Sequence, residues 1–424
     1  MSRFAAIICC TVAASPLSAV TLHLELITPD PAGGTVVDIQ PLQGADQGGY
    51  FLSLRSGAIS HRNGATGEQS VILDQVPDDN FDLAYGMTLA PDHAMSGQVY
   101  ISYATTDNRH VIARYTETAS GMLDPNSAQI VMSIQHDRSN NHYGGDVEFG
   151  PDGYLYVTTG DGNQDIHASP IDSQDVTNRL GSVLRVDVGG DAYPDDPFNN
   201  YAIPADNPDF GAGADPALWA IGLRNPFQAT FDPLTGRYFI ADVGEDGAEE
   251  INIGVAGANY GWNVYEGTAP LTGGGELATG TLTDPFYAYG HDQGQSITGG
   301  LVYRDGLAEL SILEGQYLFG DFRTPGLYGF DASSPLGTAP AITSYDFITD
   351  VGRLGSIVAL GRDGAGHLYV SSLYGGVYEV TGVSGLPAVP APLTLPLLAT
   401  GFGIMALFQR RRCRGFAIKS HTDF

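Results

Sequence analysis

The sequence predicts an all-β fold, a six-bladed β-propeller built from four-stranded antiparallel blades. Its 424 residues include 56 glycines and 25 prolines, a composition that favours many turns over long helices. Short runs of aromatic and β-branched residues, each opened by a glycine, recur six times along the chain. Their mean spacing of about 63 residues suits a blade of four strands with insertions. A closed ring of such blades leaves only short, protected strand edges.

The six recurring segments share one form, a glycine followed by a short strand and a polar turn. They are residues 49–54, 97–102, 153–158, 236–241, 315–320 and 366–371. Aromatic and β-branched runs bounded by turn residues are typical of strands. The early strand 21–26 is expected to complete the last blade and fasten the ring. A β-sandwich is the alternative, and six recurrences of one unit argue against it.

Composition divides the chain into three regions. Residues 1–19, with a basic start, an apolar run and small residues at the end, are typical of a secretory signal peptide. Residues 20–385 are expected to form the propeller. Cys9 and Cys10 lie in the leader and the third cysteine lies in the tail. The propeller is therefore expected to fold without an internal disulfide, although it is exported.

The third region, residues 386–424, begins with a Pro/Ala linker and continues with an uncharged stretch at 393–408. An arginine cluster at 410–414 follows, as in a positive-inside stop signal. The pattern resembles the VPLPA/PEP-type C-terminal sorting signals of bacterial surface proteins, which implies cleavage and surface anchoring or release. A permanent membrane anchor formed by a single transmembrane helix is the alternative. The sequence thus predicts a periplasmic, cell-surface or extracellular location in a bacterium.

The chain carries a formal net charge of −29. A nucleic-acid partner is not expected, because phosphate binding requires basic surface. A solvated acidic surface accounts for this composition. The sequence also contains no G-x-S-x-G, H-E-x-x-H, Walker or EF-hand motif.

The most informative stretch is residues 222–267. Arg224 and Asn225 stand between a glycine and a proline, which biases Asn225 towards an extended conformation and presents both side chains from a bend. A buried strand follows and leads into an oxygen-rich loop around Gly244 and Glu245. A guanidinium, an amide and a carboxylate-rich loop suit an anionic ligand held together with a hard cation.

A histidine and an aspartate flank the third recurring segment. His142 precedes its strands and Asp161 follows the second of them. If the two converge at one mouth of the ring, they form a general base with a carboxylate that fixes its tautomer. Taken alone, His142 is better read as an ordinary loop residue.

Three linked motifs resemble the soluble quinoprotein glucose/sorbosone dehydrogenase family, which includes the hedgehog-interacting-protein-like members. They are R-N-P at 224–226, an acidic loop ending in E-E-I-N at 249–252, and N-Y-G-W at 259–262. The resemblance implies a six-bladed propeller that oxidises an aldose or related polyhydroxy sugar. It also implies pyrroloquinoline quinone (PQQ) and calcium as cofactors, and an external electron acceptor.

The resemblance further implies roles for individual residues. His142 falls at the family's catalytic base and Asp161 at the carboxylate that orients it. Arg224 and Asn225 fall at the pair that contacts the quinone. The backbone carbonyls of the loop Gly244-Glu245 would hold the calcium ion. Three softer matches that would line the cofactor pocket are Thr298, Arg323 and Arg353.

Two positions depart from the pattern of active sugar dehydrogenases. Phe81 stands where they place a substrate-side glutamine, and Gly355 stands where they carry a second arginine after Arg353. Two alternatives therefore stay open. One is a non-catalytic surface binding propeller of the hedgehog-interacting type. The other is a calcium-dependent lactonase on a similar propeller, with acidic metal ligands at the ring centre.

Overall fold

The structure, a computed structural model, describes residues 20–29, 34–42, 44–136, 141–162, 172–272, 276–324, 326–351, 354–373 and 376–385. The expected leader (1–19), the expected tail (386–424) and Arg353 lie outside the described residues, so what was predicted for them stays a prediction. The chain divides into two compact units, 1–386 and 387–424, and every described residue belongs to the first. Within the described part, no helix combines the length and apolar character that a membrane crossing requires.

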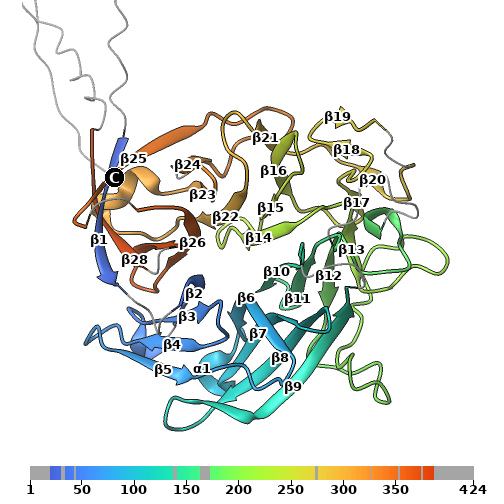
Figure 1. Cartoon of the computed structure of the whole chain (residues 1–424), viewed down its shortest axis with the longest axis horizontal. Helices are drawn as coiled ribbons and strands as arrows, with labels where there is room; N and C mark the ends of the chain where they lie inside the picture. The colour runs from blue at the N-terminus through green and yellow to red at the C-terminus, as the bar shows by residue number, and fades with distance from the viewer. Residues whose placement is uncertain are drawn as a thin grey trace, which may run out of the picture. The chain divides into compact units, whose positions relative to one another are not determined.

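The all-β prediction is confirmed, because strands form nearly all of the regular structure (Figure 1). The described helical elements are α1 (His93–Ser96) and the 3₁₀ turns η1 (Gly44–Asp46), η2 (Asp172–Gln174) and η3 (Ala308–Leu313). Each is too short to contribute a helical layer to the core, so the core lies between packed sheets.

Three of the sheets have four strands each, as predicted. The first contains β2 (Val36–Pro41), β3 (Tyr50–Leu54), β4 (Ile59–Arg62) and β5 (Gln69–Leu73). The second contains β6 (Phe81–Leu89), β7 (Gln98–Thr105), β8 (Arg109–Glu117) and β9 (Leu123–Gln135). The third contains β14 (Pro226–Phe231), β15 (Tyr238–Asp242), β16 (Ala248–Ile253) and β21 (Tyr287–Gly290).

The remaining sheets depart from a uniform count of four strands. One has six strands in the order β10 (Gly144–Phe149), β11 (Leu155–Thr159), β12 (Ser182–Val186), β13 (Leu218–Ile221), β17 (Ala258–Asn259) and β20 (Thr281–Leu282). A small hairpin pairs β18 (Tyr265–Glu266) with β19 (Ala269–Pro270). The largest has eight strands, β22 (Ile297–Val302), β23 (Gln316–Asp321), β24 (Gly326–Asp331), β25 (Thr343–Thr349), β1 (Val20–Thr28), β28 (Val377–Ser384), β27 (Leu368–Ser372) and β26 (Ile357–Arg362).

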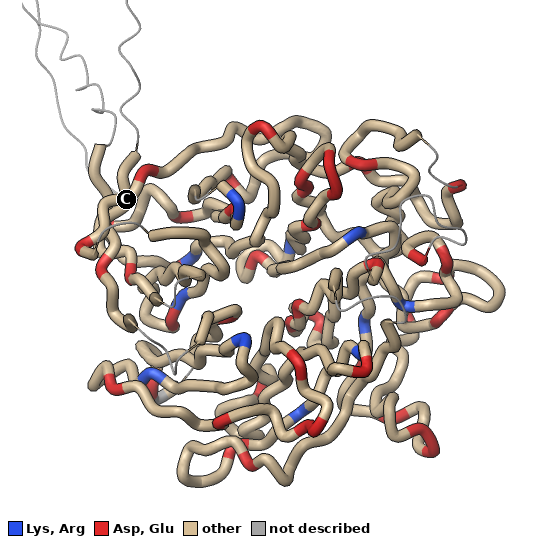
Figure 2. The backbone as a smooth tube through the Cα atoms, viewed as in Figure 1, with Lys and Arg blue, Asp and Glu red and all other residues tan. Residues whose placement is uncertain are grey.

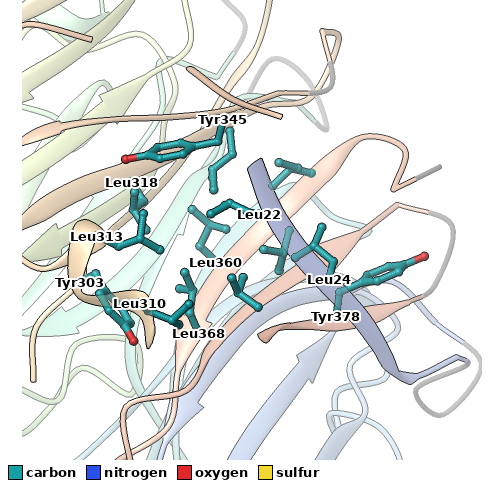
Figure 3. Packing of buried hydrophobic residues seen from close by; sticks show 14 of the residues in the cluster. Leu22, Leu24, Tyr303, Leu310, Leu313, Leu318, Tyr345, Leu360, Leu368 and Tyr378 are labelled. Carbon is teal, nitrogen blue, oxygen red and sulfur yellow. The ribbon is translucent and has the colours of Figure 1, made fainter. Parts of the chain in front are cut away.

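Strand β1 explains the size of the eight-stranded sheet. It pairs antiparallel with β28, as expected for a strand that completes the last blade, and it also pairs in parallel with β25. Leu22 and Leu24 of this strand lie in a buried cluster with Leu360, Leu368 and Tyr378 from the last three strands (Figure 3). The N-terminal strand thus fastens the end of the chain by hydrogen bonds and by apolar burial.

The sheets follow one another in a closed circuit (Figure 1). Strand β2 contacts β6, β6 contacts β10, β10 contacts β14, β14 contacts β22, β22 contacts β26, and β26 returns to β2. Each of the six recurring segments of the sequence contains or overlaps the strand next to one of these, namely β3, β7, β11, β15, β23 and β27. These second strands are almost entirely buried, because neighbouring sheets cover both of their faces. Continuous apolar runs in the sequence follow from this burial.

Candidate active site

The backbone at His142 adopts an unusual conformation. Its φ is +53°, in the left-handed region that non-glycine residues rarely occupy. The carbonyl of His142 also lies against Gly160, where a Cβ atom would come within 2.0 Å of its oxygen. Only glycine at 160 permits this approach, which brings the loop before β10 against the end of β11. Strained non-glycine residues of this kind cluster at functional sites.

The predicted pairing of His142 with Asp161 is present. The Nδ1 atom of His142 lies 2.8 Å from Oδ1 of Asp161, and both side chains are largely buried. A carboxylate at Nδ1 favours the tautomer that carries its proton there, and it directs Nε2 to serve as the base. The structure therefore brings together the histidine and the carboxylate that the sequence placed on either side of two strands.

Trp262 completes this pair and joins it to Arg224. Its indole Nε1–H donates to Oδ2 of Asp161 at 2.8 Å. The guanidinium of Arg224 lies over the face of the same indole, with Cζ 5.5 Å from the ring centroid. His142, Asp161, Trp262 and Arg224 thus form one continuous set of contacts. Trp262 is the last residue of the N-Y-G-W motif, and the sequence predicted no role for it.

The backbone of the Arg224–Asn225 pair is held by one buried carboxylate. Oδ2 of Asp242 accepts the N–H of Arg224 at 3.0 Å, and Oδ1 accepts the N–H of Asn225 at 2.6 Å. Burial raises the pKa of Asp242 to about 7, although these two donors act in the opposite direction. The Oδ1 atom of Asn225 in turn accepts the N–H of Gly144 at 3.0 Å, next to the His142 loop. The R-N-P bend is therefore fixed against both the oxygen-rich loop and the histidine loop.

The guanidinium of Arg224 is buried and incompletely paired. Nη1 donates to the carbonyl of Val243 at 3.0 Å, and Nη2 forms an ion pair with the half-exposed carboxylate of Glu245. Among the described residues, Nε has no hydrogen-bond partner. A buried, charged donor without a partner is costly unless a ligand satisfies it. The site can therefore accept an anionic group next to Trp262.

The loop predicted to bind a cation contains two backbone carbonyl oxygens that are available as metal ligands. Within the described residues, the carbonyls of Gly244 and Glu245 accept no hydrogen bond, while the amides of residues 245–248 are all bonded to a single carboxylate oxygen of Glu266. Backbone carbonyls are among the ligands that calcium prefers. The donor set thus fits a hard cation beside the anion site.

The other predicted residues form no hydrogen bond or ion pair with this set among the described residues. Thr298, on β22, is buried, and its hydroxyl has no hydrogen-bond partner among the described residues. Arg323 is exposed on the turn after β23, where its N–H donates to Asp321 at 2.9 Å. In the described part of the chain, no hydrogen bond or ion pair joins Thr298 or Arg323 to His142, Asp161 or Arg224. Phe81 packs near Gly57 and Tyr103, where the first two sheets meet.

A second polar region lies at the inner strands of the circuit. A cavity of about 190 Å³ is lined from β2, β10, β14, β22 and β26, and three acids, Asp38, Asp146 and Glu148, face it. Burial raises the pKa of Asp38 to about 6 and of Asp146 to about 8, and it raises the pKa of Glu148 well above its usual range. Across the described residues, no three acidic, histidine or cysteine side chains gather closely enough to hold a metal. Other acidic residues are spread around the circuit (Figure 2).

Comparison with known proteins gives a family match and several relatives. The sequence model of the family described as Glucose / Sorbosone dehydrogenase matches residues 41–373. The HIPL2 protein of Arabidopsis thaliana is 37% identical over 241 residues, which are 50% of this chain and 33% of that protein. The Aldose sugar dehydrogenase YliI of Escherichia coli is 28% identical over 260 residues, 57% of this chain and 64% of that protein. The chain therefore spans only a third of the first relative and less than two thirds of the second.

Solved structures show the same fold at lower identity. The soluble aldose sugar dehydrogenase of Escherichia coli in its apo-form superposes with a TM-score of 0.66 and 22% identity, covering 87% of this chain and 100% of that one. The PQQ-bound form of the aldose sugar dehydrogenase of Streptomyces coelicolor gives a TM-score of 0.62, with the same identity and coverage. Identity this low supports a shared fold and leaves the chemistry to be argued from the residues.

Proposed function

Because this chain belongs to the glucose/sorbosone dehydrogenase family, we propose that it oxidises an aldose or related polyhydroxy sugar with PQQ and calcium. The electrons pass to an external acceptor, and the protein works outside the cytoplasm of a bacterium. One observation carries the proposal: His142, Asp161, Trp262 and Arg224 form a continuous set that joins a general base to an anion-binding guanidinium. Relatives named as aldose sugar dehydrogenases support it.

The residues present fit both cofactors. PQQ is a polycarboxylate, and the unpartnered Nε of the buried Arg224 offers a donor to one of its carboxylates. The carbonyl oxygens of Gly244 and Glu245, which accept no hydrogen bond among the described residues, would hold calcium. When bound, the quinone would supply a hydride acceptor and calcium would make it more electrophilic.

The chain's own residues then have separate tasks. His142 removes the proton from the sugar hydroxyl through Nε2, while Asp161 holds the ring in position and stabilises its protonated form. Arg224 and Asn225 bind and orient the cofactor. We keep Thr298, Arg323 and Arg353 as proposed further contacts of the cofactor. Trp262 positions Asp161, the partner of the base, relative to the guanidinium of Arg224, because its ring contacts both residues.

We also propose that the circuit is a ring of six blades. Six inner strands, β2, β6, β10, β14, β22 and β26, contact one another in turn. The eight-stranded sheet then counts as two blades joined by β1, which lies between β25 and β28. On this interpretation β17 and β20 are additions to a four-stranded blade.

Two alternatives have specific observations in their favour. Phe81, in place of a substrate-side glutamine, and the similarity to the HIPL2 protein favour a surface binding propeller without catalysis. The cavity lined by Asp38, Asp146 and Glu148 supplies acids at the inner strands, as a lactonase-type site needs, although among the described residues these acids do not gather closely enough to hold a metal.

Reconstitution separates these functions. The purified full chain is titrated with PQQ with and without calcium, and aldoses are then screened with a dye as electron acceptor. Tight PQQ binding that requires calcium, followed by sugar-dependent dye reduction, supports the dehydrogenase. Absence of PQQ binding at micromolar concentration rules it out and favours the binding propeller. Calcium-dependent hydrolysis of lactones in the same preparation would favour the third function.

A further inference from the structure

Glu266 makes an unusual set of hydrogen bonds to the predicted calcium loop. Its Oε1 atom accepts the N–H groups of four consecutive residues, Glu245 at 2.7 Å, Asp246 at 3.2 Å, Gly247 at 2.9 Å and Ala248 at 3.3 Å. Only 7% of the surface of Glu266 is exposed to solvent. Because this buried carboxylate accepts four amide N–H groups, the loop folds around it as a backbone loop folds around a bound anion.

The loop sequence permits this wrapping. A Cβ atom on Gly244 would come within 2.9 Å of Oε1 of Glu266, and one on Gly247 would come within 2.8 Å of Oε2. A side chain at 247 would displace the carboxylate, and one at 244 would also collide with the carbonyl oxygen of Ala248 at 2.1 Å. Glycine at 244 and at 247 therefore permits the close contact between the loop and Glu266.

Planarity of the peptide bond fixes where the carbonyls point. The N–H of Glu245 shares a peptide group with the carbonyl of Gly244, and the N–H of Asp246 shares one with the carbonyl of Glu245. In a trans peptide the N–H and C=O bonds point in opposite directions, and neither of these bonds is cis. Because both N–H groups point at Glu266, both carbonyls point away from it.

We propose that Glu266 is the positioning residue that preforms the calcium site. It turns the carbonyls of Gly244 and Glu245 outward together, and its negative charge polarises the same two peptide groups, which makes their oxygens better cation ligands. The inference rests on the proposed calcium site. Glu266 itself does not touch the cation.

The test measures calcium binding to the full chain in the absence of PQQ, by calorimetric titration. Loss of an outer partner of a metal ligand weakens metal affinity by about 10- to 100-fold, and we expect Glu266→Gln to raise the calcium Kd by at least about tenfold. Glu309→Gln, on an exposed glutamate, is the matched control and should bind like the wild type. Hydrogen exchange of the amides of residues 245–248 should also be faster in Glu266→Gln.

Two outcomes overturn the proposal and are distinguishable. If the wild type binds calcium and Glu266→Gln binds it within twofold, the role of Glu266 is wrong and the calcium site stands. If the wild type binds no calcium at millimolar concentration, the calcium site and the role of Glu266 are both wrong. Should Glu266→Gln not fold, Glu266→Asp keeps the charge but reaches fewer amides. It should show an intermediate loss of affinity, and wild-type affinity in that variant would contradict the proposal.

Discussion

Trp262 donates its indole N–H to Asp161 at 2.8 Å, across 101 positions of the sequence. The same carboxylate binds His142 through its other oxygen, also at 2.8 Å. One aspartate therefore links a candidate base to an aromatic ring that lies under Arg224. This relationship makes the orientation of His142 depend on a residue with which it forms no hydrogen bond among the described residues.

Trp262→Phe should separate the two contacts of the indole. Phenylalanine keeps an aromatic face under Arg224 but cannot donate to Asp161. Losing one hydrogen bond to a buried carboxylate costs about 1–3 kcal/mol, and we expect kcat to fall by roughly tenfold while PQQ affinity changes little. Trp219→Phe is the matched control, since the other tryptophan lies in an apolar cluster away from this contact. Equal kcat values for the wild type and Trp262→Phe would contradict a positioning role.

His142→Ala tests the base. General-base removal costs about two to four orders of magnitude in turnover, while quinone affinity should stay within a few-fold. His61→Ala, on a histidine of β4, provides the control. Turnover like that of the wild type would show that His142 is not the base. Asp161→Asn should give a smaller loss, through orientation of the ring.

Arg224→Ala tests the anion site. Removing one partner of a buried charge pair costs about 2–5 kcal/mol, so PQQ binding should weaken by roughly 30-fold or more. Arg224→Lys should recover part of this, since an ammonium cannot make the planar two-point contact. PQQ affinity and the melting temperature of the cofactor-free protein are measured together. A large drop in melting temperature with little change in affinity would assign Arg224 to structural support of the Val243 carbonyl.

The acids at the inner cavity predict how stability depends on pH. Burial raises the pKa of Asp38 to about 6 and that of Asp146 to about 8. Between the ordinary carboxyl pKa of about 4 and these values, the folded state holds more protons than the unfolded state. The contribution of these two acids to the free energy of unfolding should therefore fall as pH rises from about 4 to about 8, with the Asp38 part complete near pH 6. The buried His110 and His136, whose pKa burial lowers to about 3, contribute in the opposite direction below about pH 6.5.

Denaturant unfolding at several pH values, with chelator present, measures this dependence. Asp146→Asn should flatten the slope above pH 6, because the amide does not titrate. Asp346→Asn, at an exposed position of β25, should leave the slope unchanged. Equal slopes for the wild type and Asp146→Asn above pH 6 would contradict the prediction.

Local sequence determined much of this protein. The six recurring segments specify strands by short-range pattern, and each coincides with the second strand of a successive unit of the circuit. The R-N-P bend is likewise a local matter of proline and chain direction. The family was also recognisable from motifs that are contiguous in sequence, and the family match confirms it. Uniform four-stranded sheets were not a reliable inference, because β1 bridges two units and β17 and β20 add to another.

Tertiary structure decided which side chains meet. Nothing near Trp262 in the sequence identifies Asp161 as its acceptor, and the same holds for Asp242 beneath the Arg224–Asn225 backbone. Thr298 and Arg323, chosen by position along the chain, form no hydrogen bond or ion pair with that set among the described residues. Strand propensity acts over a few residues, whereas these contacts depend on which strands pair: β14 pairs with β15 beside Asp242, and β17 lies in the same sheet as β10 and β11, beside Asp161. Pairing between strands that are separated in the sequence, which no local pattern specifies, therefore determines the hydrogen bonds of the candidate site.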